Sequence, residues 1–384
     1  MKEGWTYKKL GEVARVQNGF AFDSNLFNES GKGTPLIRIR DIKRNQTYTY
    51  TIENCPIEFN IENGDLLIGM DGDFNVCTWE GGHAYLNQRV CHVVPSEKVL
   101  SRYLYYLLPF PLKLINDKTT FATVKHLSSK QVCNILLPLP SISEQQRIVS
   151  RLDAAFAHID ELKANAEKQL SEARTLFQKA LTKAMEPKEG WEEKKFKDLC
   201  SFVRGPFGGS LKKNCFVPSG YAVYEQQNAI YNKFSFRYFI DEEKYNSMIR
   251  FSVSPGDLIM SCSGTIGKVA IVPEGAAKGI INQALLKLSP KKVLDKYYLK
   301  YLMESSLFDS LIAHYSDGAA IKNIASVAIL KEIELSIPPL SEQQRIVSRL
   351  DSLSAHVREL EEVTQKTIAE CDALKQALLR AVFE

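Results

Sequence analysis

Apolar residues recur at alternating spacings of four and three along two long stretches of the chain, residues 143–186 and 341–384. A sustained 3.5-residue period is typical of a helix in a coiled coil, whose apolar seam packs against a partner helix. We therefore predict two long helices that pair with each other. The predicted seam consists of Ile148, Leu152, Ala155, Ile159, Leu162, Ala166, Ala173, Leu176 and Ala180 in the first helix, and Ile346, Leu350, Leu353, Val357, Leu360, Cys371, Leu374 and Leu378 in the second.

The remaining stretches, residues 1–142 and 187–340, hold short apolar runs separated by Gly-Asp and Asn-Gly pairs. Such runs are typical of β-strands bounded by turns. The expected fold class is α+β: two tandem mixed α/β globules, each followed by a long helix. We predict strands at Pro35–Arg40, Asp65–Ile68, Arg89–Val94 and Asp257–Met260, and short amphipathic helices at Tyr103–Leu108 and Lys296–Met303.

The chain is a tandem duplication. Its 11-residue string Ser143–Asp153 returns letter for letter as Ser341–Asp351, 198 residues later. Within the globules, Leu86–Gln88 parallels Ile281–Gln283, whereas residues 20–60 and 205–250 share almost nothing. Matching segments that alternate with segments unique to each half indicate one fold that carries two different binding specificities. Because each helix leaves an equivalent globule, we expect the two helices to pair antiparallel.

Each copy of the repeated string opens with Ser-x-x-Gln, the pattern of a helix capping box. We predict that Ser143 with Gln146, and Ser341 with Gln344, begin the two helices. At about 1.5 Å per residue each helix would be about 65 Å long. The alternative, that each helix packs on its own globule, suits a polar rod of this length less well.

Charge favours nucleic acid at the globules. Residues 1–142 carry 16 Lys and Arg against 14 Asp and Glu, and residues 187–340 carry 20 against 16. The helices are neutral or acidic, with 7 against 7 and 6 against 8. No apolar run is long enough to span a bilayer. The eight cysteines are scattered without a CxxC pair, so we expect a reduced, cytoplasmic protein.

A search for catalytic motifs finds only incomplete patterns. Ser263–Lys268 resembles a Walker loop, but Cys262 and Val269 replace residues that the motif requires. Cys77, His83, Cys91 and His92 match no common zinc spacing. Asp71 and Asp73 lie on a Gly-rich stretch that is more typical of a turn. We therefore expect no catalysis, metal or cofactor on this chain.

The remaining candidates are side chains that could bind DNA. Arg and Lys can form hydrogen bonds to guanine, and Asn and Gln can form them to adenine. A solvated surface is the alternative role for each candidate. We propose Gln226 and Asn228 as base readers and Lys212 and Lys213 as phosphate contacts. The full DNA-binding set is Arg38, Arg40, Lys43, Arg44, Gln46, Asn87, Gln88 and Arg89 in the first globule, and Lys212, Lys213, Gln226, Gln227, Asn228, Lys268, Asn282 and Gln283 in the second.

Over essentially its whole length the chain resembles the DNA specificity subunits of type I restriction-modification systems, the HsdS family. The resemblance rests on the Pro-x-x-Ser-Glu-Gln-Gln-Arg-Ile blocks at Pro140–Ile148 and Pro338–Ile346, and on Trp5–Leu10 and Trp191–Phe196. It implies two target recognition domains, residues 1–142 and 187–340, that each read one half of an interrupted double-stranded DNA site. The helices at 143–186 and 341–384 would be the central and distal conserved regions.

The resemblance also implies partners. The coiled coil would set the gap between half-sites and dock two methyltransferase subunits, which supply S-adenosylmethionine, and two restriction subunits can then join. The repeated helix starts present the same side chains twice, as a partner that docks twice would need. The partner-binding set is Glu144, Gln145, Arg147, Arg151, Glu342, Gln343, Arg345 and Arg349. The alternative is a non-catalytic coiled-coil scaffold without DNA specificity.

Overall fold

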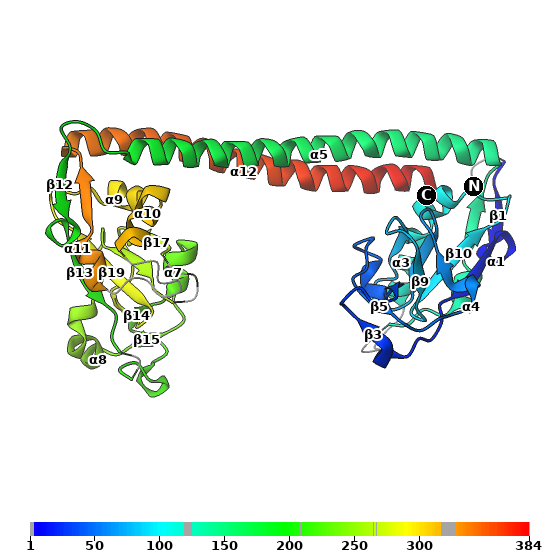
Figure 1. Ribbon diagram of the computed structural model, residues 1–384, viewed down its shortest axis with the longest axis horizontal. Coiled ribbons are helices and arrows are strands. Elements are labelled where there is room, and N and C mark those ends of the chain that lie inside the picture. The colour runs from blue at the N-terminus through cyan, green and yellow to red at the C-terminus, as the bar shows by residue number, and fades with distance from the viewer. Residues whose placement is uncertain are drawn as a thin grey trace. The chain divides into compact units, whose positions relative to one another are not determined.

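The computed structural model describes residues 4–118, 125–207, 209–263, 265, 267–315 and 327–383. The chain forms two compact units (Figure 1), one comprising Met1–Asn165 with Lys366–Glu384 and the other Ala166–Gln365. Two helices of 44 residues, α5 (Ile142–Met185) and α12 (Leu340–Phe383), contribute to both units. Each unit therefore holds one globule and a part of each long helix.

The first globule is built from short elements. Its strands are β1 (Thr6–Lys9), β2 (Ala14–Asn18), β3 (Phe27–Asn28), β4 (Thr34–Ile37), β5 (Tyr50–Thr51), β6 (Asn60–Ile61), β7 (Leu66–Gly69), β8 (Val76–Thr78), β9 (Ala84–Leu86), β10 (Val90–Pro95) and β11 (Leu136–Leu139). Its helices are α1 (Leu10–Val13), α2 (Ser101–Leu107), α3 (Pro109–Lys118) and α4 (Ser129–Cys133), with 3-10 turns η1 (Ser24–Leu26), η2 (Ile39–Asp41) and η3 (Ile57–Phe59).

The second globule shares the first and last parts of this order and differs between them. Its strands are β12 (Glu192–Lys195), β13 (Cys200–Arg204), β14 (Tyr221–Tyr224), β15 (Phe239–Ile240), β16 (Leu258–Ser261), β17 (Val269–Ile271), β18 (Gly279–Ile281), β19 (Leu285–Pro290) and β20 (Glu334–Ile337). Its helices are α6 (Phe196–Leu199), α7 (Gln226–Tyr231), α8 (Glu242–Ser247), α9 (Lys296–Met303), α10 (Ser306–Tyr315) and α11 (Val327–Glu332), with 3-10 turns η4 (Lys213–Cys215) and η5 (Ile249–Phe251).

Corresponding sheets recur in the two globules. The antiparallel sheet β2-β10-β7-β8 matches β13-β19-β16-β17, and the terminal ladder β1-β11 matches β12-β20. A second sheet in each globule contains one parallel pair, β4 with β9 or β14 with β18. The strands predicted around Ile68, Val93 and Ile259 are confirmed as β7, β10 and β16. The repeat in the sequence is therefore a repeat of topology.

Each globule joins the long helices through a shared apolar core. In the first unit, Ile148, Leu152 and Leu379 pack with Tyr103 and Leu107 of α2. In the second unit, Leu181, Ile346 and Leu350 pack with Tyr298 and Leu302 of α9. Burial of such side chains contributes about 1.5–3 kcal/mol each. The ends of the long helices are thus part of the globular cores.

Within each unit the two long helices run antiparallel. In the first unit Lys163 of α5 pairs with Asp372 of α12 at 3.3 Å, and Asp160 pairs with Lys375 further along. In the second unit the Nη2 of Arg174 lies 2.6 Å from the Oε1 of Glu361. Residue numbers rise on one helix as they fall on the other, so the predicted antiparallel pairing is confirmed.

The predicted seam is correct at most positions and wrong at three leucines, Leu162, Leu176 and Leu374. Ile148, Leu152 and Ile159 are buried, but Leu162 and Leu176 are 59% and 65% exposed. Beyond Ile159 the predicted Ala166, Ala173 and Ala180 are covered, and so are Lys163, Leu170, Phe177 and Leu181, which were not predicted. In α12 the predicted Cys371 is buried and Leu378 packs against the core, whereas Leu374 is exposed. A straight helix has 3.6 residues per turn, so a seam extended at 3.5 drifts off the contact face.

Two details of the predicted boundaries are also wrong. The strand expected at Pro35–Arg40 ends at Ile37, because the chain turns into η2. The capping boxes do not form, since Ser143 and Ser341 lie inside helices that begin at Ile142 and Leu340. The hydroxyl of Ser141 accepts the hydrogen bond from the backbone N–H of Glu144 instead.

Among the described residues, no helix has the length and apolarity to cross a membrane.

Candidate nucleic-acid interface

In each globule the parallel strand pair brings two polar segments to one sheet edge. In the second globule, β14 is followed by Glu225 and α7, and its neighbour β18 is followed by Asn282 and Gln283. The backbone N–H of Asn282 donates to the carbonyl of Tyr224 at 2.9 Å. In the first globule Asn87 makes the equivalent bond to the carbonyl of Ile37 at 3.3 Å. The two globules thus present the same edge with different side chains.

In each globule a glycine lets the backbone pass close to this edge. A Cβ atom on Gly19 would lie 2.1 Å from the carbonyl oxygen of Asn87, and one on Gly205 would lie 1.8 Å from that of Asn282. The strands before these glycines, β2 and β13, can pass the edge only without a side chain at that point. The close approach places Arg204, at the end of β13, beside the polar segments.

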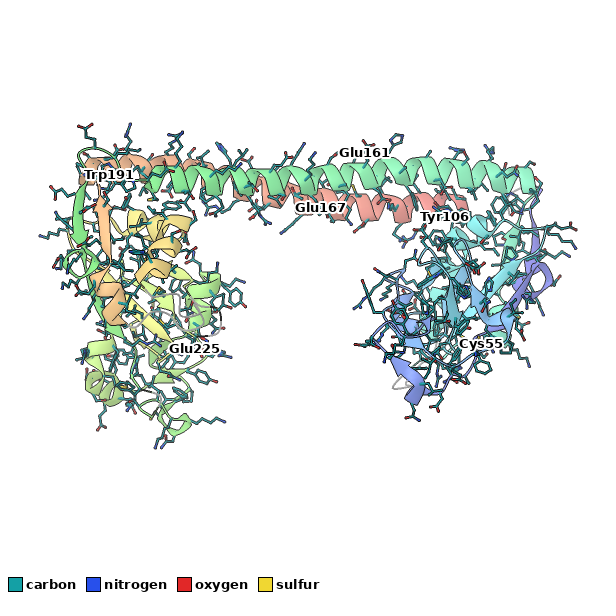
Figure 2. All side chains as sticks on the ribbon, viewed as in Figure 1. Cys55, Tyr106, Glu161, Glu167, Trp191 and Glu225 are labelled. Carbon is teal, nitrogen blue, oxygen red and sulfur yellow. The ribbon has the colours of Figure 1, made fainter. Side chains whose placement is uncertain are left out.

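In the second globule this edge opens into a cavity of about 570 Å³. Figure 2 labels Glu225, which precedes the first turn of α7. Most of the residues that line the cavity carry polar side chains, as a site that reads base edges would. Its lining residues are Arg204, Glu225, Gln226, Gln227, Ile230, Tyr231, Arg237, Ser263, Asn282, Gln283 and Ala284.

One ion pair organises the wall of the cavity. The Glu225 carboxylate accepts hydrogen bonds from the Nε and Nη2 of Arg237, at 3.0 and 2.8 Å. It also accepts one from the Nε2 of Gln227 at 3.2 Å. The Glu225 side chain is 12% exposed, whereas that of Arg237 is 63% exposed. Hydrogen bonding to Glu225 raises the pKa of Arg237, so its charge is fixed.

Four of the predicted DNA-binding residues line this cavity, namely Gln226, Gln227, Asn282 and Gln283. Asn228 does not: it is 1% exposed, accepts from the backbone N–H of Glu225 and donates to the carbonyls of Lys233 and Ser235. Its predicted role as a base reader is therefore wrong, because its amide is used to cap α7. Lys212, Lys213 and Lys268 are exposed and lie outside the cavity wall.

In the first globule the predicted residues occupy the equivalent edge. Asp41 takes the place of Asn228, since its carboxylate accepts from the backbone N–H of Arg38 at 2.8 Å. The Arg38 guanidinium lies over the ring of Phe27, and Arg40 donates to the hydroxyl of Thr49 at 3.0 Å. These contacts hold both arginines at the edge.

The other predicted residues of this globule divide into exposed and buried groups. Lys43 pairs with Asp73 at 2.7 Å, and Arg89 lies 3.6 Å from Asp71, yet both cations remain more than half exposed. Arg44, Gln46 and Gln88 are exposed. Asn87 is 8% exposed, so its predicted contact with DNA is wrong for its side chain. Its counterpart Asn282 is half-buried and lines the cavity.

The Cys and His residues of the metal pattern form no metal site in the described ranges. Burial raises the pKa of the Cys77 and Cys91 thiols to about 12, which disfavours metal-binding thiolates. His92 lies 3.3 Å from Asp65 and His83 lies 2.7 Å from Glu62. No group of three or more His, Cys, Asp or Glu side chains there could hold a metal. In the Walker-like loop, Gly264 and Ile266 lie outside the described residues.

The repeated helix starts present a charged surface, but not with every predicted residue. Gln145 and Gln343 are fully buried, so their predicted exposure to a partner is wrong. The neighbouring pairs Glu144–Arg147 and Glu342–Arg345 lie on the surface, with a closest approach of 2.7 Å in each. Hydrogen bonds from these arginines lower the pKa values of both glutamates. Arg151 and Arg349, one turn further along each helix, are also exposed.

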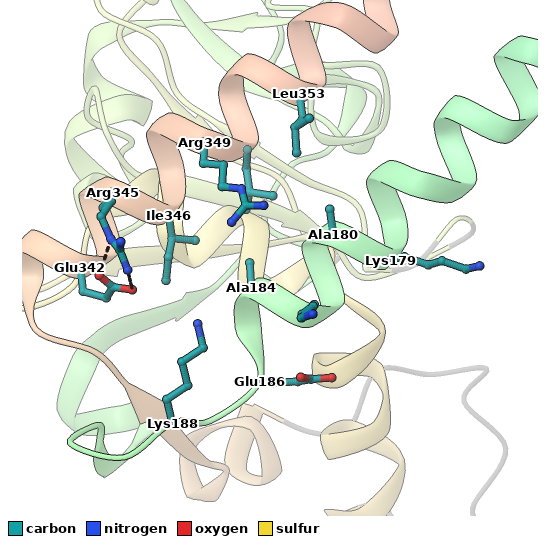
Figure 3. A pocket seen from close by; sticks show the side chains of 12 residues that line it. Lys179, Ala180, Ala184, Glu186, Lys188, Glu342, Arg345, Ile346, Arg349 and Leu353 are labelled. Atoms are coloured by element: carbon teal, nitrogen blue, oxygen red, sulfur yellow. Dashed lines mark hydrogen bonds and ion pairs between the residues drawn. The ribbon is translucent and has the colours of Figure 1, made fainter.

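In the second unit this surface adjoins a groove of about 480 Å³ between α5 and α12 (Figure 3). Its floor is apolar, formed by Ala180, Ala184, Ile346, Leu350 and Leu353. Its rim is predominantly basic, with Lys179, Lys183, Lys188, Arg345 and Arg349 against Glu186 and Glu342. An apolar floor within a charged rim is typical of a protein-binding surface.

Sequence reasoning missed Arg204, Glu225 and Arg237. Arg204 could have been found, because its neighbour Gly205 aligns with Gly19 in the repeated frame and marks the same edge. Glu225 and Arg237 fall in residues 205–250, where the two halves share almost nothing. Their pairing across the loop after α7 is a tertiary contact without a local sequence signal.

Comparison with known proteins agrees with this architecture. The model of the type I restriction modification DNA specificity domain matches residues 2–172 and 188–370. The chain is 30% identical to the Type I restriction enzyme EcoBI specificity subunit of Escherichia coli, over 99% of this chain and 86% of that protein. It is 23% identical to the Type I restriction enzyme MjaVIII specificity subunit of Methanocaldococcus jannaschii, over 85% of this chain and 80% of that protein.

Solved structures share the fold. A chain from work on complex assembly and conformational transition of the type I R-M system superposes with a TM-score of 0.78, at 18% identity, covering 100% of this chain and 98% of that one. The HsdS subunit from Thermoanaerobacter tengcongensis gives 0.56, at 20% identity, covering 100% and 97%. Two globules of the matched domain type, two paired helices and a family model that matches both halves lead to one conclusion: the chain belongs to the HsdS family of type I restriction-modification DNA specificity subunits.

Proposed function

We propose that this chain reads a bipartite, interrupted site in double-stranded DNA, with one half read by each globule. The target recognition domains would be residues 1–142 and 187–340, and the central and distal regions residues 143–186 and 341–384. The observation that carries the proposal is the duplicated sheet edge, whose frame is the same in both globules while its side chains differ. The same backbone arrangement with two different sets of polar side chains suits the reading of two different half-sites.

The two long helices would set the distance between the half-sites. Antiparallel pairing of the helices suits two half-sites on one duplex. Two methyltransferase subunits would dock at the two helix starts, one on the surface of Glu144, Arg147 and Arg151 and the other on that of Glu342, Arg345 and Arg349. These partners would carry S-adenosylmethionine, and the specificity chain itself would not catalyse. Restriction subunits would join this complex.

Domain exchange combined with methylation mapping tests the proposal. Residues 187–340 are replaced by the corresponding domain of another specificity subunit, and the complex with its methyltransferase is expressed in a host that lacks other methylation. We expect one half-site to change while the other half-site and the gap are unchanged. A change in both halves, or in neither, would contradict independent reading. A complex that binds all DNA sequences alike would support the scaffold alternative.

A further inference from the structure

We infer that Arg237 is a guanine reader, held in its reading position by Glu225, so that the half-site recognised by residues 187–340 contains a guanine at that position. The inference deepens the proposed function and rests on it. It assigns a base to a residue outside the set that the sequence suggested, and it follows from how the two side chains are bonded.

The hydrogen bonds of Arg237 leave one reading face free. A guanidinium has two faces that can donate two parallel hydrogen bonds, a side face of Nε with Nη2 and an end face of Nη1 with Nη2. Glu225 occupies the side face, at 3.0 and 2.8 Å. Within the described part of the chain, no hydrogen bond of Nη1 is found. The end face therefore remains available to a ligand.

Guanine is the base that this face matches. In the major groove guanine presents two adjacent acceptors, O6 and N7, and a bidentate arginine satisfies both. Adenine presents a donor, N6, beside its N7, so the same face would meet one acceptor and one donor. A phosphate could also accept two hydrogen bonds, but phosphate contacts carry no sequence information. The test must separate these two ligands.

The surroundings of Arg237 favour a base over a phosphate. Arg237 lines the same cavity as Gln226, Gln227, Asn282 and Gln283, all of which carry amides suited to base edges. Its guanidinium also lies over the ring of Tyr238, at 5.4 Å from the centroid. The carboxylate and the ring fix the arginine from two sides, so little side-chain freedom is lost when it binds.

The paired glutamate is placed for support rather than for reading. Glu225 is only 12% exposed, and its carboxylate is engaged by Arg237 and Gln227. A nearly buried carboxylate needs such partners, and in return it aims the arginine into the cavity. Glu225 is therefore a positioning residue, and its loss should reduce discrimination at one base pair without reducing the general affinity for DNA.

The experiment uses the complex of the full chain with its methyltransferase and a duplex that carries its mapped site. Each guanine of the half-site assigned to residues 187–340 is replaced in turn by 7-deazaguanine, which lacks the N7 acceptor, or by inosine, which keeps O6 and N7. At one position we expect 7-deazaguanine, but not inosine, to weaken binding by roughly ten- to hundredfold. Arg237→Ala should abolish this sensitivity, and Glu225→Gln should reduce it. Arg250→Ala, at an exposed position in the same domain, is the matched control.

Each other outcome overturns the inference. If Arg237→Ala leaves the sequence preference and the 7-deazaguanine effect intact, the ion pair is only structural. If Arg237→Ala weakens all sequences alike and lowers the salt slope by about one, Arg237 contacts a phosphate. A mapped half-site without guanine would reject the inference while the bipartite reading stands. Absence of any sequence preference in the wild-type complex would reject both.

Discussion

Gln145 and Gln343 lie 198 residues apart and make the same three hydrogen bonds. Gln145 Oε1 accepts from the backbone N–H of Leu100 at 2.9 Å, and its Nε2 donates to the carbonyls of Lys98 and Pro140 at 3.1 and 3.0 Å. Gln343 repeats this pattern with Asp295, Val293 and Pro338, at 2.8, 2.9 and 2.9 Å. Each glutamine thus joins the start of a long helix to its globule.

These glutamine hydrogen bonds should contribute to the free energy of unfolding of the chain. Gln145→Ala, or Gln343→Ala, would leave one buried N–H and two carbonyls without their partner. Since an unsatisfied buried group costs about 1–3 kcal/mol, we expect each variant to lower the free energy of unfolding by about 2–4 kcal/mol. Urea denaturation of the full chain measures the change. Gln146→Ala, at the exposed neighbouring position, is the control and should change it by less than about 0.5 kcal/mol. Equal effects of both substitutions would contradict this contribution.

The charges between the long helices should favour pairing of α5 with α12. Lys163 and Arg174 lie on α5, and their partners Asp372 and Glu361 lie on α12. We expect Arg174→Glu to destabilise the second unit and the double variant Arg174→Glu with Glu361→Arg to restore it, with a coupling free energy of about 0.2–1 kcal/mol. Urea denaturation of the wild type, both single variants and the double variant gives this value. Additive single and double effects would show that the pair contributes nothing.

The length of the coiled coil should set the gap in the DNA site. Insertion of seven residues after Asn165 in α5 and after Gln365 in α12 adds two helical turns to both partners and about 10 Å of length. This corresponds to about three base pairs of rise. We expect methylation mapping to show both half-sites unchanged and a longer gap between them. An unaltered gap in an active complex would reject this role of the helices.

The charged rim at the start of α12 should bind one partner subunit. We expect Arg345→Glu combined with Arg349→Glu to reverse the local charge and to remove one of two methyltransferase copies from the complex. Native mass spectrometry counts the subunits. Lys168→Glu, on an exposed part of α5, is the control and should leave the count at two. Retention of both copies by the double variant would place the docking surface elsewhere.

An acid-sensitive contact lies between α11 and the start of the second globule. Hydrogen bonds from Lys195 and Lys197 lower the pKa of Glu332 from 4.5 to about 2. Because this pKa is lower in the folded chain, the stabilisation is fully present above about pH 4.5 and is lost as the pH falls through about 2. We expect the difference in unfolding free energy between wild type and Glu332→Gln to shrink between about pH 6 and pH 3. Urea midpoints at the two pH values measure it, and a constant difference would exclude this contribution.

The sequence predicts the architecture well because the architecture depends on periodic and repeated signals. The duplication, the two long helices and the strands β7, β10 and β16 follow from patterns within a few residues. The candidate surface is predicted in part: Gln226 and Gln283 line the cavity, whereas Asn87 and Asn228 are buried. Polar side chains of the same type can read a base or cap a helix, and the sequence does not distinguish the two roles.

The sequence by itself determined that two equivalent globules alternate with two pairing helices, since the repeat and the apolar period are properties of the chain alone. Tertiary structure decided where the seam runs, because the drift of a 3.6-residue helix replaces Leu162 by Lys163 at the contact. It also decided the pairing of Glu225 with Arg237, which lie 12 residues apart. Such a contact depends on how the loop after α7 folds back, and no local pattern encodes that path.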